Sequence, residues 1–170
     1  MPDRPARQTR PANSRRRESW SGWGERSPDE KDAVGVFLDD VTYAFADVSV
    51  LSIPVLYYLL VTGSTEYFGV KAAALVAWLT MVVVAALIRG GWVTPLATDV
   101  PGWVAMTPWL VALRLVYYNA TLALAAYGGA WVGDLWSSPV ASLGVAFVVG
   151  VVSVGVFPLL AERFYGAVAE

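Results

Sequence analysis

The sequence predicts an all-α, multi-pass membrane protein with four transmembrane helices in a bundle and a disordered N-terminal tail. Three observations predict it: long stretches without a charged residue, an apolar composition and a highly charged N-terminus. The charge-free stretches are residues 48–65, 72–88, 115–133 and 135–161. Each is long enough, or nearly so, to cross a hydrocarbon layer about 30 Å thick at about 1.5 Å per helical residue.

The composition indicates a membrane protein and excludes several kinds of site. Hydrophobic residues make up 56% of the chain, and the mean hydropathy is +0.53, whereas a soluble domain carries roughly 45–50% apolar residues. The chain has no Cys and no His. It therefore lacks disulfides, thiolate and imidazole metal ligands and the commonest general base. We expect no metal and no cofactor.

The N-terminus differs from the rest of the chain. Residues 1–32 contain eight of the 12 basic residues and six of the 14 acidic ones. High charge with few apolar residues predicts a disordered, basic cytoplasmic tail over residues 1–27. Ser27 and Pro28, with Glu30 at the third helical position, form a capping box. Residues 28–41 are therefore predicted to be a cytoplasmic or juxtamembrane helix that leads into the first span.

Local signals place the helix ends of a transmembrane domain over residues 42–170. A hydroxyl residue before proline is typical of a helix start, and Thr107-Pro108 and Ser138-Pro139 open the third and fourth spans. Arg89 followed by Gly90 and Gly91 is typical of a helix end. The predicted spans are 42–62, 68–88, 108–131 and 139–160, to within about 2–4 residues.

The positions of Lys and Arg predict the orientation. Residues 1–32 hold eight of them, and Arg89 and Arg163 add one each, whereas the two outer loops hold only Lys71. Because cytoplasmic flanks retain positive charge, we expect both termini in the cytoplasm and the protein in the cytoplasmic membrane. Ten Arg against two Lys, with much Ala, Val and Gly, are typical of a prokaryote of high GC content.

Two charged residues fall inside predicted spans. Asp47 lies in the first span, and Arg114 lies about six residues into the third, so both sit within roughly 10 Å of the cytoplasmic boundary. A charge at this depth persists when it is paired, hydrated or needed for function. Three interpretations stay open for these candidate residues: a structural ion pair, separate snorkelling to the inner interface, or a substrate or proton site.

Further acidic residues precede Asp47 on the same helix. Asp40, Tyr43 and Asp47 share one face, and Asp39 is adjacent. This face could form an acidic entry path for a cation, continued inward by a kink at Pro54. We favour the plainer interpretation, that the first two carboxylates lie in cytoplasmic water, because only Asp47 is deep enough to need explanation.

The remaining candidates concern contacts between helices. Asn119 lies in the middle of a span, so we expect it to form an interhelical polar contact. Ser142, Ala146 and Gly150 form a stripe of small residues at four-residue spacing on the fourth span. Such a stripe allows another helix backbone to approach closely, within the chain or in a dimer. Gly129 and Gly133 repeat the spacing more weakly at a helix end.

No enzymatic motif is recognisable in the sequence: it has no HExxH, Walker loop, serine elbow or dinucleotide-binding glycine pattern. Asp47 has no second carboxylate at its depth, since Asp99 and Asp134 belong to loops on opposite sides. We therefore expect a noncatalytic scaffold or accessory subunit of a membrane complex. The alternative is a small oligomeric transporter or channel that uses Asp47 and Arg114. The expected partners are the lipid bilayer and a membrane protein or a second copy, with no nucleic acid.

Overall fold

The computed structural model describes residues 33–62, 69–98 and 108–169, and all regular elements in these segments are helical. The elements are α3 (Ala33–Leu51), α4 (Ile53–Thr62), α5 (Val70–Arg89), α6 (Pro108–Ala123), the π-helical turn η1 (Leu124–Gly128), α7 (Gly129–Leu135) and α8 (Pro139–Ala169). The predicted tail over residues 1–27, the capping box at Ser27 and the hydroxyl of Thr107 lie outside the described residues.

Three helices in the described segments are long and apolar enough to cross a membrane: Val70–Arg89, Pro108–Leu135 and Pro139–Phe164. A fourth crossing exists if Val34–Leu51 and Ile53–Thr62 count as one, since these two helices qualify only together and are bent by 66°. The predicted first span, 42–62, is therefore not one straight helix. It is broken at Ser52, just before Pro54, which has no N–H to continue the helical ladder.

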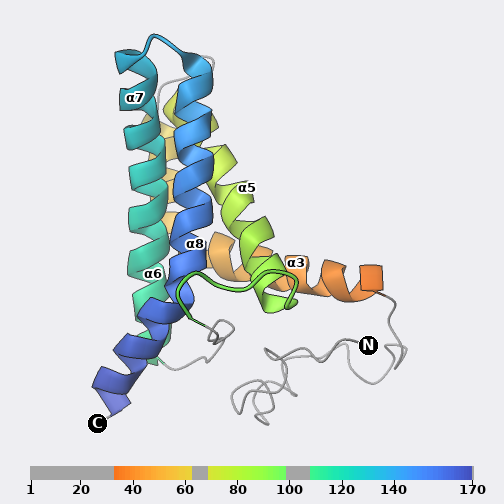
Figure 1. Ribbon diagram of the computed structural model, residues 1–170. Helices are drawn as coiled ribbons and strands as arrows, with labels where there is room; N and C mark the ends of the chain where they lie inside the picture. Colours follow the sequence, from red (N-terminus) through yellow and green to blue (C-terminus); the bar gives the residue numbers. More distant parts are fainter. Residues whose placement is uncertain (1–32, 63–68, 99–107, 170) are drawn as a thin grey trace.

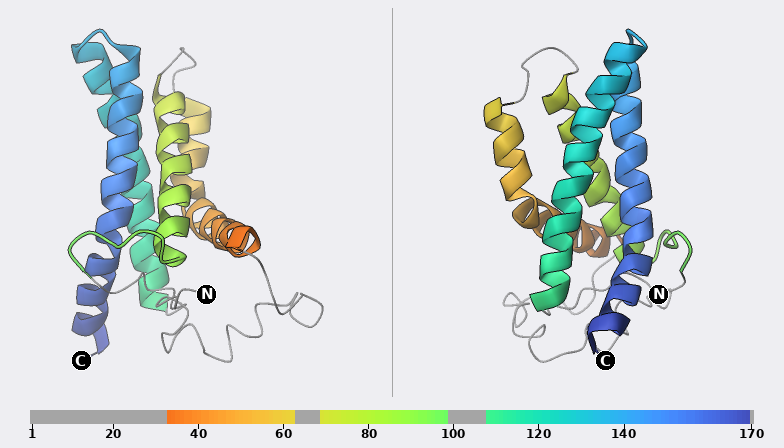
Figure 2. Two further views of the ribbon diagram at one scale, coloured as in Figure 1. Left: turned by 45° about the vertical axis from the view of Figure 1, so that its right-hand side comes forward. Right: turned by 90° about the vertical axis from the view of Figure 1, so that its left-hand side faces the viewer.

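The long helices run side by side along the length of the molecule, and α3 runs across them (Figure 1). The views in Figure 2 show α4 beside the upper part of the bundle and α3 crossing the lower part. The start of α3 and the end of α8 lie at the same end of the molecule (Figure 1). The bend between α3 and α4 thus turns the N-terminal half of the first element across the bundle.

The second predicted span, 68–88, corresponds to α5, which ends just before Gly90 and Gly91, as the sequence predicts. Gly91 has φ 72°, a conformation that glycine adopts without strain. Its N–H donates to the Ile88 carbonyl at 3.0 Å, and the Trp92 N–H donates to the Leu87 carbonyl at 2.9 Å. This is the Schellman arrangement, which provides partners for the last carbonyls of the helix.

The third and fourth elements begin at the prolines that the sequence indicated, Pro108 and Pro139. The third includes the π-helical turn η1, and the fourth continues to Ala169, well beyond the predicted end at residue 160. Pro158 lies inside α8, where it removes one helical hydrogen bond without ending the helix. Close to it, the Leu96 N–H donates to the Gly155 carbonyl at 2.9 Å, so the chain after α5 is bonded to this part of α8.

Small residues bring the helices of the core together, and α5 and α8 form the most extensive contact. A Cβ on Gly150 would lie 3.2 Å from the Ala77 carbonyl oxygen, so the two backbones approach closely there.

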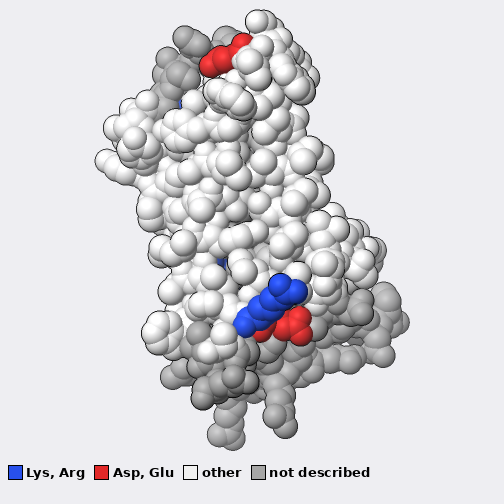
Figure 3. All heavy atoms as spheres, turned by 60° about the vertical axis from the view of Figure 1, so that its left-hand side comes forward, with Lys and Arg blue, Asp and Glu red and all other residues white. Residues whose placement is uncertain are grey.

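Large apolar side chains cover much of the outside of the molecule. In the face shown in Figure 3, charged side chains gather near the two ends, and other residues form almost all of the broad middle.

Candidate functional site

The structure brings Asp47 and Arg114 together. Arg114 Nη1 lies 2.6 Å from Asp47 Oδ1, and Arg114 Nε donates to the Leu110 carbonyl at 3.3 Å. The Arg114 side chain is 2% exposed and that of Asp47 is 20% exposed. The guanidinium is therefore enclosed within the bundle, and the geometry is that of a buried ion pair rather than of two separately snorkelling side chains.

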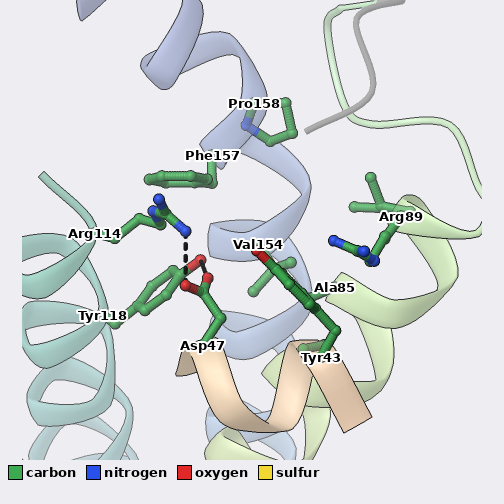
Figure 4. Close-up of a pocket in the computed structure, with 11 residues that line it drawn as sticks. Tyr43, Asp47, Ala85, Arg89, Arg114, Tyr118, Val154, Phe157 and Pro158 are labelled. Atoms are coloured by element: carbon green, nitrogen blue, oxygen red, sulfur yellow. Dashed lines mark hydrogen bonds and ion pairs between the residues drawn. The ribbon is translucent and has the colours of Figure 1, made fainter. Parts of the chain in front are cut away.

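Aromatic side chains surround this ion pair (Figure 4). The Tyr118 hydroxyl donates to Asp47 Oδ2 at 3.2 Å, so both carboxylate oxygens have partners on α6. Tyr118 is 5% exposed, and its ring centroid lies 5.5 Å from that of Phe157 on α8. Three helices, α3, α6 and α8, therefore meet at Asp47 and its surroundings.

A second ion pair joins the same face of α3 to α5, about two helical turns before Asp47. Arg89 Nε lies 3.1 Å from Asp40 Oδ1, and the Asp40 side chain is 1% exposed. The Arg89 guanidinium carbon lies 3.6 Å from the centre of the Tyr43 ring, which is a cation–π contact. The expectation that Asp40 lies in cytoplasmic water is therefore wrong, although Asp39 is exposed. The transverse course of α3 turns Asp40 towards the end of α5.

A small cavity with a mostly apolar wall and a few charged groups lies between the two ion pairs. Its volume is about 70 Å³, and by its volume it holds a few water molecules. Charged and aromatic side chains line it on α3, α5, α6 and α8, among them Tyr43, Asp47, Arg89, Arg114, Tyr118 and Phe157. Two arginines but only one aspartate, Asp47, line the cavity. The charge of Arg89 is balanced by Asp40, which lies beside it outside the lining, so the two ion pairs together have no net charge to select ions of one sign.

Arg89→Lys tests how much the geometry of the second ion pair contributes. Lysine keeps the charge but loses the planar group that lies over Tyr43. We expect a loss of about 1 kcal/mol in stability, measured as a fall of a few degrees in the unfolding midpoint in detergent. Arg163→Lys, at an exposed position on α8, is the matched control. Equal effects of the two variants would contradict a specific role for the Arg89 geometry.

Asn119 contacts the point where α3 ends and α4 begins. Its Oδ1 accepts from the Val55 N–H at 2.9 Å, and its Nδ2 donates to the Leu51 carbonyl at 2.7 Å. Nδ2 also lies 2.6 Å from the Leu115 carbonyl oxygen one turn earlier on α6. The mid-span amide therefore makes interhelical bonds to backbone groups of a broken helix rather than to another side chain.

The stripe of small residues on α8 packs within the chain. Ser142 is 2% exposed and Ala146 is 0% exposed. At the Ser142 end the neighbour is α7, because a Cβ on Gly129 would lie 2.8 Å from the Ser142 carbonyl oxygen. At the Gly150 end the neighbour is α5, through Ala77. The glycine pair on α7, which carried the weaker sequence signal, thus packs against the first residue of the stripe.

The site includes residues that sequence reasoning did not assign to it. In the sequence, Arg89 is interpreted as a positive helix end and as a cytoplasmic positive charge, whereas its pairing with Asp40 depends on where α3 lies. Tyr118 follows Arg114 by one helical turn and so shares its face, a signal that could have placed it beside Asp47. Within the described segments, no group of three or more acidic side chains could hold a metal ion.

A family model described as a domain of unknown function (DUF8215) matches residues 31–164. This range is most of the chain and includes both ion pairs, the cavity and Asn119. No curated protein matches the chain, and no solved structure matches it. The description of the family names no activity, ligand or partner, so the role of the site is inferred from its geometry.

Proposed function

The chain belongs to the family described as a domain of unknown function (DUF8215), and we propose that it is a noncatalytic scaffold or accessory subunit of a membrane complex. The observation that carries this proposal is the pairing of the buried charges. Asp40 and Arg114 are the charged side chains that the described segments bury, and each is bound to an oppositely charged group on another helix. Charges used in this way hold helices together, and in the described segments each buried charge is already paired rather than presented to a substrate.

In this proposal the chain crosses the membrane four times, and the first crossing is bent. With α4 upright, its 10 residues reach about 15 Å. The 19 residues of α3, inclined by 66°, add about 12 Å to this height. The sum is close to a hydrocarbon thickness of about 30 Å, so the bent pair reaches from one interface to the other.

The proposed orientation has both termini in the cytoplasm of a prokaryotic cell. The start of α3 and the end of α8 lie at the same end of the bundle (Figure 1), as an even number of crossings requires. The arginine-rich N-terminal region precedes this end, and positive charge is retained on the cytoplasmic side. Asp47 and Arg114 then lie in the inner half of the membrane, and the outer half of the bundle is packed with small and apolar residues.

Purification in a mild detergent tests the proposed role. We expect the tagged full-length chain, expressed in its native membrane, to retain a second membrane protein at a fixed stoichiometry, identified by mass spectrometry. Purified protein in liposomes should then show no proton or cation flux above that of protein-free liposomes. A chain that purifies alone as a monomer would contradict the accessory role, because a scaffold needs a partner.

Transport is the second candidate, and the cavity beside Asp47, with charged groups in its wall, is the observation that favours it. A transporter needs a wet path through the bundle, and such paths are lined by polar residues. Flux that is present in wild-type liposomes and lost in Asp47→Asn would favour transport over the accessory role. Asp134→Asn, at an exposed position before α8, is the control for a nonspecific effect of charge removal.

A further inference from the structure

The break in the first crossing has an unusual hydrogen-bond arrangement. In a continuous helix the Val55 N–H would donate to the Leu51 carbonyl, four residues earlier. Here the side-chain amide of Asn119 stands between these two groups and binds both, at 2.9 Å and 2.7 Å. One backbone hydrogen bond is thus replaced by two bonds to a residue of α6. The bend leaves neither backbone group without a partner.

The residues around the break make the chain easier to bend there than elsewhere in α3 or α4. Pro54 cannot donate a backbone hydrogen bond, and its ring crowds the preceding turn of a straight helix. The buried Ser52 hydroxyl has no hydrogen-bond partner in the described part of the chain. The chain can therefore change direction here more easily than elsewhere in α3 or α4, and Asn119 is the side chain that bridges the break.

The part of the chain before the break forms one wall of the cavity between the ion pairs. Tyr43, Ala44 and Asp47 all lie on α3, and the opposite wall belongs to α5, α6 and α8. Figure 4 shows Asp47 rising from α3 towards Arg114, with the cavity side chains around it. A change in the angle of α3 would therefore widen or close the cavity, whereas the packing of α5 against α8 would be unaffected.

We propose that α3 is a hinged cover over the cavity between the ion pairs, with the break between Leu51 and Val55 as its hinge and the Asn119 amide as the group that holds the closed angle. The two ion pairs latch the cover to α5 and α6. The inference is independent of whether the protein acts as an accessory subunit or as a transporter. It assigns to Asn119 a positioning role, which acts through the angle of α3.

Distance measurements between two spin labels test the hinge. The chain has no cysteine, so Leu38→Cys on α3 and Val148→Cys on α8, both exposed, give a specific label pair in the full-length protein. Leu38 lies about 20 Å before Leu51 along the helix, so a swing of about 30° moves its label by on the order of 10 Å. We expect Asn119→Leu to shift or broaden the distance distribution by this amount in lipid bilayers.

The matched control is Ala120→Leu, at the exposed neighbouring position of α6, which should leave the distribution unchanged. A distribution in folded Asn119→Leu that equals the wild-type one would overturn the proposal, because the angle would then be held by other contacts. A shift of equal size in Ala120→Leu would overturn the specific role of the amide.

A second measurement serves if Asn119→Leu does not fold. Ala44 lines the cavity but is only 4% exposed, and Ala77, on α5, is 0% exposed. With Asn119 retained, transient opening of α3 should make Ala44→Cys react with a water-soluble maleimide at least tenfold faster than Ala77→Cys. Equal rates would show that α3 stays closed and would overturn the hinge.

Discussion

Asp47→Asn is expected to destabilise the protein by about 3–5 kcal/mol, since it leaves the Arg114 guanidinium enclosed without its carboxylate. The Arg114 side chain is 2% exposed, so bulk solvent does not replace the lost partner, and the few waters that the adjoining cavity can hold offset only part of the loss. The variant also weakens the bond from the Tyr118 hydroxyl, which now meets an uncharged amide. The measurement is the free energy of unfolding, or the unfolding midpoint, of the purified protein in detergent.

Removing the arginine instead of the aspartate should destabilise the protein less. Arg114→Gln leaves Asp47, which is 20% exposed and can take up water from the adjoining cavity. The double variant, Asp47→Asn with Arg114→Gln, should be more stable than Asp47→Asn alone because no unpaired charge remains. Losses that simply add would contradict pairing. Asp134→Asn, at an exposed position, should have almost no effect and controls for the loss of a negative charge.

Gly129→Val is expected to separate α7 from α8. A Cβ at this position would lie 2.8 Å from the Ser142 carbonyl oxygen, and a backbone atom cannot move aside as a flexible side chain can. We expect a loss at the upper end of the about 1–3 kcal/mol typical of overpacking. The unfolding midpoint and the elution volume in detergent measure the loss of stability and any expansion.

Gly144→Val is the matched control for this substitution. Gly144 lies in α8, and a Cβ there would meet nothing within 4 Å. It therefore carries the same change in helix propensity without the clash. Equal stability of the two variants would mean that α7 and α8 do not need their close approach.

The long apolar helices could be predicted because their signals are local. Residues 72–88 carry no charge and end at two glycines, and α5 follows this pattern to Arg89. The prolines at 108 and 139 start α6 and α8 for a similar reason, since the fixed φ of proline suits a first turn. The effect of Pro158 could not be predicted in this way. A proline inside a helix can kink the helix or end it, and which of these happens depends on what packs around it.

The candidate site could be predicted only in part. Position along a helix follows from residue number, so Asp47 and Arg114 could be assigned to one level of the predicted helix bundle. Whether they touch depends on the rotation and tilt of two helices that are distant in sequence. The pairing of Asp40 with Arg89 was missed because a straight first helix would carry Asp40 beyond the end of the bundle. The bend that prevents this depends on a side chain of α6.

By itself the sequence determined that most of this chain is apolar helix, where three of the long helices begin or end, and which charges lie deep enough to need partners. Hydrophobicity, caps and glycine stops act over a few residues, so they can be read without knowing the neighbours. Only the tertiary structure decided the direction of α3 and the partners of its two aspartates. The amide of Asn119 replaces a backbone bond between residues more than 60 positions away in the chain, and no local pattern records such a contact.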